Sequence, residues 1–189
     1  MNNVNTLLAI CWLLFIVVWI ALSLKAKKTL GGIERRQNPW VRLIVTVAVV
    51  ILIFNIGVFK DFVAYQLFPS NDLAQGIGVL ICAGGIAFAI WARIHLDRNW
   101  GMPMSLKEKP ELVTTGPYHF VRHPIYTGIA VAMLGSMITA GFMWLVWFVL
   151  FSSSFIYSAK KEEKMMLIQF PEEYRRYMKR TKMMIPFVF

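Results

Sequence analysis

Residues 123–159 read HPIYTGIAVAMLGSMITAGFMWLVWFVLFSSSFIYSA, a run of 37 residues without a charge. A helix of this length would extend about 55 Å, nearly twice the roughly 30 Å hydrocarbon core of a bilayer. A single straight membrane span therefore does not account for it. Gly135, Ala140 and Gly141 lie near its middle, where small residues that weaken a helix allow the chain to turn. We expect two short helices in a hairpin that enters and leaves the membrane on the same side.

Three further charge-free intervals precede this stretch, at residues 1–24, 43–59 and 73–92. Each is close to the about 20 residues that a helix needs to cross the hydrocarbon core. The first lacks basic residues before its apolar run, so we expect it to be retained rather than cleaved as a signal peptide. The predicted fold is an all-α polytopic membrane bundle of five transmembrane helices, the last two a hairpin. The first three spans are expected at residues 5–24, 41–59 and 72–95.

The net charge of +10 is unevenly distributed between the spans. Residues 25–42, 93–122 and 160–182 carry +5, +2 and +4, whereas residues 60–72 carry −1. The positive-inside rule assigns the three basic segments to the cytoplasm. The N-terminus is then outside, the C-terminus is cytoplasmic, and the hairpin returns to the side that it left. Because this topology explains the basic residues, we expect no nucleic-acid partner.

Several residues within the spans favour packing over chemistry. Cys11 and Cys82 lie in apolar segments, and neither has a second ligand at metal spacing, so we expect small buried side chains rather than a disulfide. Asn55 adds an amide side chain to the second span and suits a hydrogen bond between helices. Small residues in the third span would let a neighbouring helix approach closely; they are Gly76, Gly78, Gly84, Gly85 and Ala89.

Polar segments follow the first, third and last spans. Gly31 and Gly32 predict a turn after the first. Residues 93–126 are polar but include aromatic residues, which argues for an ordered, functional loop. Residues 160–189 predict a charged helix that breaks at Pro171. It resumes as a basic helix with an aromatic and Met-rich side, suited to anionic lipid headgroups.

The sequence VRHPIY, residues 121–126, marks the entrance to the long apolar stretch. Pro124 suits the first position of a helix, and the free N–H groups and positive dipole end there favour an anion. Arg122 adds a full charge on a planar donor fork. An arginine beside a span is also expected from topology alone, whereas His123 is not needed for insertion.

His119 and His123 are four residues apart, a spacing that lets two imidazoles share a metal on one helical face. Pro117 and Pro124 make a continuous helix through both residues improbable, so no metal site is expected. Glu162 and Glu163 follow the apolar stretch directly. Such carboxylates can bind an ammonium group or act as general bases, or they belong to a solvated cluster with the neighbouring lysines.

Together these motifs resemble a known family. LVTTGPYHFVRHPIYTG at 112–128, EEKMMLIQFPEEYRRY at 162–177 and the terminal Ile185 and Pro186 resemble the isoprenylcysteine carboxyl methyltransferases. More broadly, they are similar to the membrane methyltransferases that include phospholipid N-methyltransferases. The resemblance spans about residues 96–186. It divides the chain into an N-terminal three-helix membrane part, 1–95, and a C-terminal catalytic part, 96–189, within one integrated membrane domain.

The resemblance implies S-adenosylmethionine as methyl donor, with S-adenosylhomocysteine as product, in a cytoplasmic pocket that is not a Rossmann fold. It implies that Glu162 and Glu163 lie near the methionine amino group or the methyl acceptor, and we expect Arg122, Glu162 and Glu163 to be the catalytic residues. It also implies cofactor contacts from the following residues: Glu111, Leu112, Val113, Tyr118, His123, Pro124, Ile125 and Tyr126.

The acceptor is expected to be a lipophilic or lipidated molecule that enters from the bilayer among membrane lipids. Eukaryotic members that methylate prenylated protein C-termini carry an Arg one helical turn before the Glu pair. Here that region is Tyr157-Ser158-Ala159-Lys160, so Lys160 or Arg122 would have to bind a substrate carboxylate. Two other readings remain open: an NADPH-dependent enzyme similar to membrane sterol reductases, and a non-catalytic scaffold or small transporter.

Overall fold

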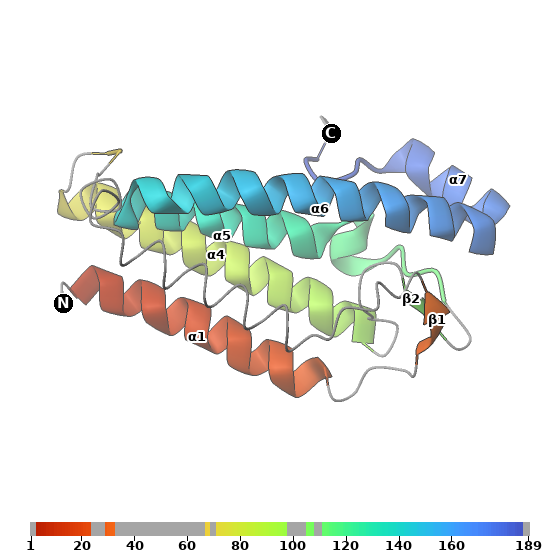
Figure 1. The fold of residues 1–189 in the computed structure, drawn as a ribbon, viewed down its shortest axis with the longest axis horizontal. Helices are drawn as coiled ribbons and strands as arrows, with labels where there is room; N and C mark the ends of the chain where they lie inside the picture. Colours follow the sequence, from red (N-terminus) through yellow and green to blue (C-terminus); the bar gives the residue numbers. More distant parts are fainter. Residues whose placement is uncertain are drawn as a thin grey trace.

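The computed structural model describes residues 3–23, 29–32, 67–68, 71–97, 105–107 and 111–186. It is a bundle of long helices, which confirms the predicted all-α membrane class (Figure 1). The elements are α1 (Asn3–Ser23), β1 (Thr29–Gly32), α4 (Asp72–Leu96), β2 (Ser105–Lys107), the 3-10 helix η2 (Gly116–His119), α5 (Pro124–Ala140), α6 (Phe142–Gln169) and α7 (Pro171–Arg180). The span expected at residues 41–59, with Asn55, lies outside the described residues.

Three of the described helices, α1, α4 and α6, are long and apolar enough to cross a membrane. The fourth apolar helix, α5, is shorter. Its last residue is followed by Gly141, whose φ of 91° lies in the region that favours glycine, and α6 begins at the next residue. The predicted hairpin and its turn are therefore confirmed.

The prediction that both hairpin helices are short is wrong for the second. Helix α6 has 28 residues, which corresponds to about 42 Å at 1.5 Å per residue. No proline or glycine interrupts it between Phe142 and Gln169, so the helix continues through the charged residues 160–164. Because about 20 residues already cross the hydrocarbon core, the C-terminal third of α6 extends beyond it.

Helices α4 and α5 pack backbone to backbone through the small residues that the sequence indicated. A Cβ atom on Gly85 would lie 2.6 Å from the carbonyl oxygen of Gly128, and one on Gly128 would lie 2.6 Å from that of Gly85. By contrast, Gly76 and Gly84 have no such neighbour within 4 Å. Close approach of these two helices fixes where α5 begins relative to α4.

Helix α1 joins this pair through both apolar and polar contacts. Trp12 donates from Nε1 to Ser136 Oγ at 3.0 Å and stacks on Trp144 with ring centroids 5.2 Å apart. Arg93 is buried and donates from Nη2 to the Leu22 carbonyl at 2.6 Å, which satisfies a carbonyl at the end of α1. Both cysteines are free, as expected; Cys82 is buried in the core.

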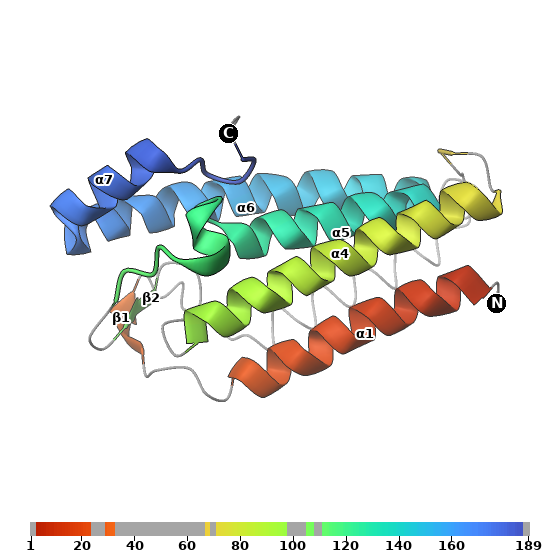
Figure 2. The same ribbon diagram turned by 180° about the vertical axis from the view of Figure 1, so that it is seen from behind.

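One end of the bundle gathers the C-terminal ends of α1, α4 and α6 and the start of α5, whereas the N-terminus lies at the opposite end (Figure 1, Figure 2). At the first end β1 pairs with β2 in an antiparallel ribbon. Gly31 and Gly32 therefore lie in a strand rather than in the predicted turn. The pairing puts the segments after α1 and α4 at the same end of the bundle, as the charge distribution requires.

Candidate functional site

The C-terminal segment closes over the start of α5 by strand-like hydrogen bonds. Val121 and Lys182 form a parallel bridge, and the next two N–H groups, of Arg122 and His123, donate to the carbonyls of Lys182 and Met183 at 2.9 and 3.0 Å. Inside α5, Thr127 Oγ1 donates to the Met184 carbonyl at 2.7 Å. These bonds fix the backbone of Arg122 and His123 before Pro124 begins the helix.

Arg122 and Glu163 form a buried ion pair at this point. Arg122 Nε donates to Glu163 Oε1 at 2.6 Å, and the two side chains are 9% and 8% exposed. Arg122 Nη1 also donates to the carbonyl of Thr181. Two donor positions of the guanidinium therefore bind groups of the protein itself. These bonds connect the start of α5 to α6 and to the segment after α7.

His123 lies between the two adjacent carboxylates of α6. Its Nδ1 is 3.4 Å from Glu162 Oε2, and its Nε2 is 3.3 Å from Glu163 Oε1, although the latter contact is not aligned as a hydrogen bond. Burial alone would lower the pKa of His123, but the contacts with both carboxylates outweigh burial and raise it above its ordinary value. The two carboxylates therefore favour the protonated form of the imidazole.

Glu162 is the more exposed carboxylate of the pair, with a side chain 26% accessible. Its Oε1 accepts a 2.6 Å hydrogen bond from the Tyr126 hydroxyl. The Tyr126 ring stacks on His123 and on Phe155 of α6, with centroids 5.6 and 4.8 Å apart. The Glu162 carboxylate and the rings of Tyr126 and Phe155 suit a cationic group.

The other predicted cofactor residues are distributed around this cluster. Tyr118 and Ile125 pack with Ala92 of α4 in a buried apolar cluster, against which Val113 also packs. Burial raises the pKa of Tyr118, so its hydroxyl remains protonated. Pro124 is fully buried and Glu111 is exposed.

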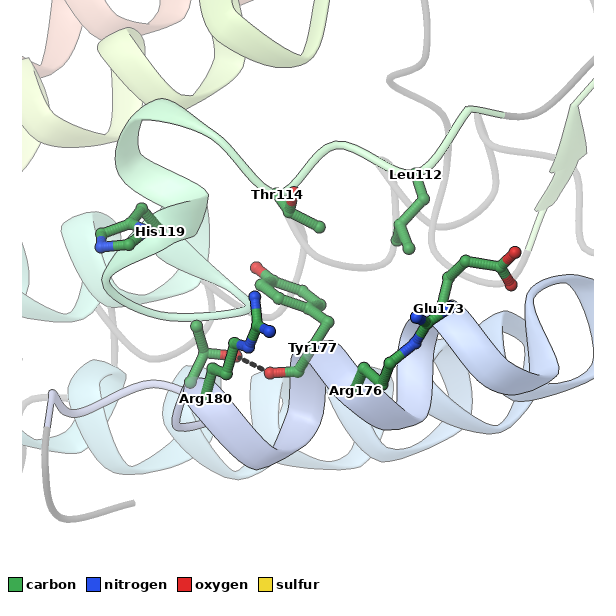
Figure 3. Close-up of a pocket in the computed structure, with 8 residues that line it drawn as sticks. Leu112, Thr114, His119, Glu173, Arg176, Tyr177 and Arg180 are labelled. Carbon is green, nitrogen blue, oxygen red and sulfur yellow. Dashed lines mark hydrogen bonds between the residues drawn. The ribbon is translucent and has the colours of Figure 1, made fainter.

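A cavity of about 480 Å³ lies between the segment before α5 and helix α7 (Figure 3). Leu112 is the one predicted site residue that lines it. The other lining residues were not predicted to belong to a binding site: Thr114, His119, Glu173, Arg176, Tyr177, Arg180 and Thr181. The residues of α7 among them recur at i, i+3, i+4 and i+7, the period of one helical face, which was the available signal.

The aromatic side of α7 is turned inward. Tyr174 and Tyr177 are buried, and the Tyr177 hydroxyl donates to the Tyr118 carbonyl at 2.5 Å. Burial raises the pKa of both hydroxyls. These rings hold α7 against the loop before α5.

His119 ends η2 and is exposed, whereas His123 is buried ahead of α5. The two imidazoles are not on one helical face. Within the residues that the structure describes, no group of three potential metal ligands occurs.

The profile of a family described as phospholipid methyltransferase matches residues 73–173. This match covers more than half of the chain and begins within α4, further toward the N-terminus than the resemblance at residues 96–186. It ends in α7, so it includes α5, α6 and both carboxylates of the cluster. No curated protein matches the chain at a significant level.

Proposed function

Because the chain belongs to the phospholipid methyltransferase family, we propose that it transfers a methyl group from S-adenosylmethionine to a lipophilic acceptor. The family is one of integral membrane methyltransferases, and the apolar helices agree with an integral membrane protein. The observation that carries the proposal is the partly buried cluster of Arg122, His123, Tyr126, Glu162 and Glu163 at one end of the bundle.

The charge of this cluster supports the choice of methyl donor. Arg122 pairs with Glu163, so Glu162, the more exposed carboxylate, is the one that can face a cation. S-adenosylmethionine supplies a methyl group on a sulfonium, whose positive charge disappears on transfer. Carboxylates and aromatic faces in a partly buried site stabilise that charge, so we assign Glu162 and the Tyr126 ring to the reacting end.

The protein groups then have distinct tasks. Glu162 accepts the proton of an amine, thiol or phenol acceptor, whereas a carboxylate acceptor needs no base. Arg122 acts as a positioning residue, because its Nε and Nη1 donors are already used by Glu163 and Thr181. Tyr118, Ile125 and Val113 form the apolar wall beside the adenosine, with Leu112 and Glu111 at its edge.

The acceptor reaches this cluster from the bilayer in our proposal. Pro124 marks the membrane entrance of α5, and the carboxylates lie in the part of α6 that extends beyond the about 20 residues needed to cross. The reactive head of a lipid therefore meets the cluster at the membrane boundary. The basic segments favour a cytoplasmic location for this end.

Methyl transfer from labelled S-adenosylmethionine into a total lipid extract tests the proposal directly. Purified protein in proteoliposomes is expected to label a lipid that mass spectrometry then identifies. Glu162→Gln is expected to reduce the rate at least about 100-fold if Glu162 is the base. Glu172→Gln, on the exposed first turn of α7, is the matched control and is expected to retain activity.

Two results would contradict the assignment. Unchanged methylation by the Glu162→Gln protein would exclude Glu162 from the reacting end. Binding of NADPH in place of S-adenosylmethionine, measured by titration of the same preparation with both, would favour the reductase reading.

A further inference from the structure

The cavity between α7 and residues 112–119 has a composition that the proposed transfer chemistry does not require. Its volume of about 480 Å³ is within the range of about 300–1,000 Å³ typical of small-molecule sites. We propose that this cavity is a binding site for a phosphate group, with Arg176 and Arg180 as the principal ligands.

Arg176 and Arg180 lie four residues apart on α7, so their side chains share one face of the helix. Within the part of the chain that the structure describes, neither guanidinium forms an ion pair. Arg176 Nε makes a long 3.4 Å contact with the Glu172 carbonyl, which leaves its terminal nitrogens available. Two planar donor forks match the oxygen atoms of a phosphate.

The remaining lining residues complete a site with one polar and one apolar side. The Thr114 hydroxyl and the His119 ring add hydrogen-bonding groups, and Leu112 and Tyr177 supply apolar surface for whatever the phosphate is attached to. The single carboxylate of the lining, on Glu173, lies toward the opposite end of the cavity from His119 (Figure 3). The positive charge is therefore concentrated near Arg180.

The position of the cavity brings it to the membrane boundary. Lys182, two residues after Arg180, pairs with Val121, and α5 enters its apolar stretch three residues after Val121. Arg180 thus lies at the level where lipid phosphates are abundant. A lipid headgroup and a soluble phosphate are both sources of the proposed ligand.

Binding of a phosphate at this site would also stabilise the position of Arg122 in the cluster at the start of α5. Thr181 lines the cavity, and its carbonyl accepts the hydrogen bond from Arg122 Nη1. A phosphate on Arg180 would immobilise the adjoining backbone and hence the partner of Arg122. Binding is therefore expected to raise the unfolding temperature of the protein.

Native mass spectrometry and thermal unfolding of the full-length protein in detergent test the site without any methyl donor. One arm compares phosphatidic acid with diacylglycerol of the same acyl chains, which differ only in the phosphate. The other compares inorganic phosphate with chloride at equal ionic strength. Preferential binding of phosphatidic acid identifies a lipid source, and stabilisation by inorganic phosphate identifies a soluble one.

Arg176→Ala with Arg180→Ala is expected to weaken phosphate binding at least about tenfold. The matched control, Arg175→Ala with Lys179→Ala, removes the same charge from exposed positions of α7 outside the cavity and is expected to stay within about twofold. Equal losses in the two proteins would indicate nonspecific attraction, and no phosphate preference in either arm would also overturn the site.

A third outcome distinguishes this site from the proposed cofactor pocket. If S-adenosylmethionine stabilises the protein through Arg176 and Arg180 and phosphate does not, the cavity belongs to the methyl donor and the phosphate site is wrong. Because the assay follows binding alone, loss of the phosphate site would leave the methyl-transfer proposal untouched.

Discussion

Arg122 and Glu163, 41 residues apart in the sequence, form a 2.6 Å ion pair that joins the entrance of α5 to α6. Removing one partner of a buried pair leaves an uncompensated charge and typically costs about 3–5 kcal/mol. We expect Arg122→Met and Glu163→Gln each to lower the unfolding temperature in detergent strongly. The double variant is expected to lose less than the sum of the two, because the remaining charge is also removed.

Arg175→Met provides the control for that measurement. Arg175 is exposed on α7, so its loss is expected to change the free energy of unfolding by less than about 0.5 kcal/mol. Additive losses at Arg122 and Glu163 would show that the pair has no coupling and that each residue acts through other contacts.

The position of His123 predicts a pH-dependent stability. Its pKa is raised above 6.5 on folding, so the folded protein holds the proton more tightly than the unfolded chain. The groups that face the ring are Glu162 and Glu163, with Tyr126 stacked on it and Arg122 bound to Glu163. The resulting stabilisation is complete below about pH 6.5 and is lost as the pH rises through the raised value.

Unfolding temperatures of the wild-type and His123→Gln proteins across this pH window check the prediction. The advantage of the wild type is expected to shrink as the pH rises. His119→Gln, with an exposed ring outside the cluster, is expected to follow the wild-type curve. A gap between wild type and His123→Gln that widens with pH would show that the folded protein favours the neutral ring.

Tyr126 combines two contacts that substitutions can separate. Tyr126→Phe removes the hydrogen bond to Glu162 but keeps the ring and its stacking contacts with His123 and Phe155, so we expect a lower kcat with little change in the KM for S-adenosylmethionine. Tyr126→Leu removes the ring as well, and loss of a cation–π contact of about 0.5–2 kcal/mol is expected to raise that KM. Identical KM values for the two variants would place the sulfonium elsewhere.

The sequence predicted the parts of this structure that depend on local composition. The length of residues 123–159 and the position of Gly141 were sufficient to predict the hairpin. A single helix of 37 uncharged residues would be much longer than the hydrocarbon core is thick. The β1–β2 ribbon was missed because it pairs residues 29–32 with residues 105–107, far apart in the sequence, and Gly31 and Gly32 have no strand preference. The charged cluster was predicted from a resemblance, whereas the pairing of Arg122 with Glu163 is a tertiary contact between residues 41 positions apart.

The cavity beside α7 was not predicted from the sequence. The sequence predicted that Arg176 and Arg180 belong to a basic helix. Such a helix can pack on a lipid surface or on another part of the protein. Whether α7 packs on protein depends on Tyr174 and Tyr177, which are buried against the loop before α5. Hydrophobic periodicity indicates that a face is covered but does not identify what covers it.

Adjacent glycines in α4 offer a sharp test of the helix interface on which the site depends. Gly85 approaches the backbone of α5 so closely that a Cβ atom would lie 2.6 Å from the Gly128 carbonyl oxygen, whereas Gly84 has no such neighbour within 4 Å. Gly85→Ala is therefore expected to separate the helices and cost about 1–3 kcal/mol. Gly84→Ala introduces the same methyl group one residue away and is expected to be neutral or stabilising by up to about 1 kcal/mol. Unfolding temperatures in detergent compare the two directly, and equal effects would mean that α4 and α5 do not pack through this face.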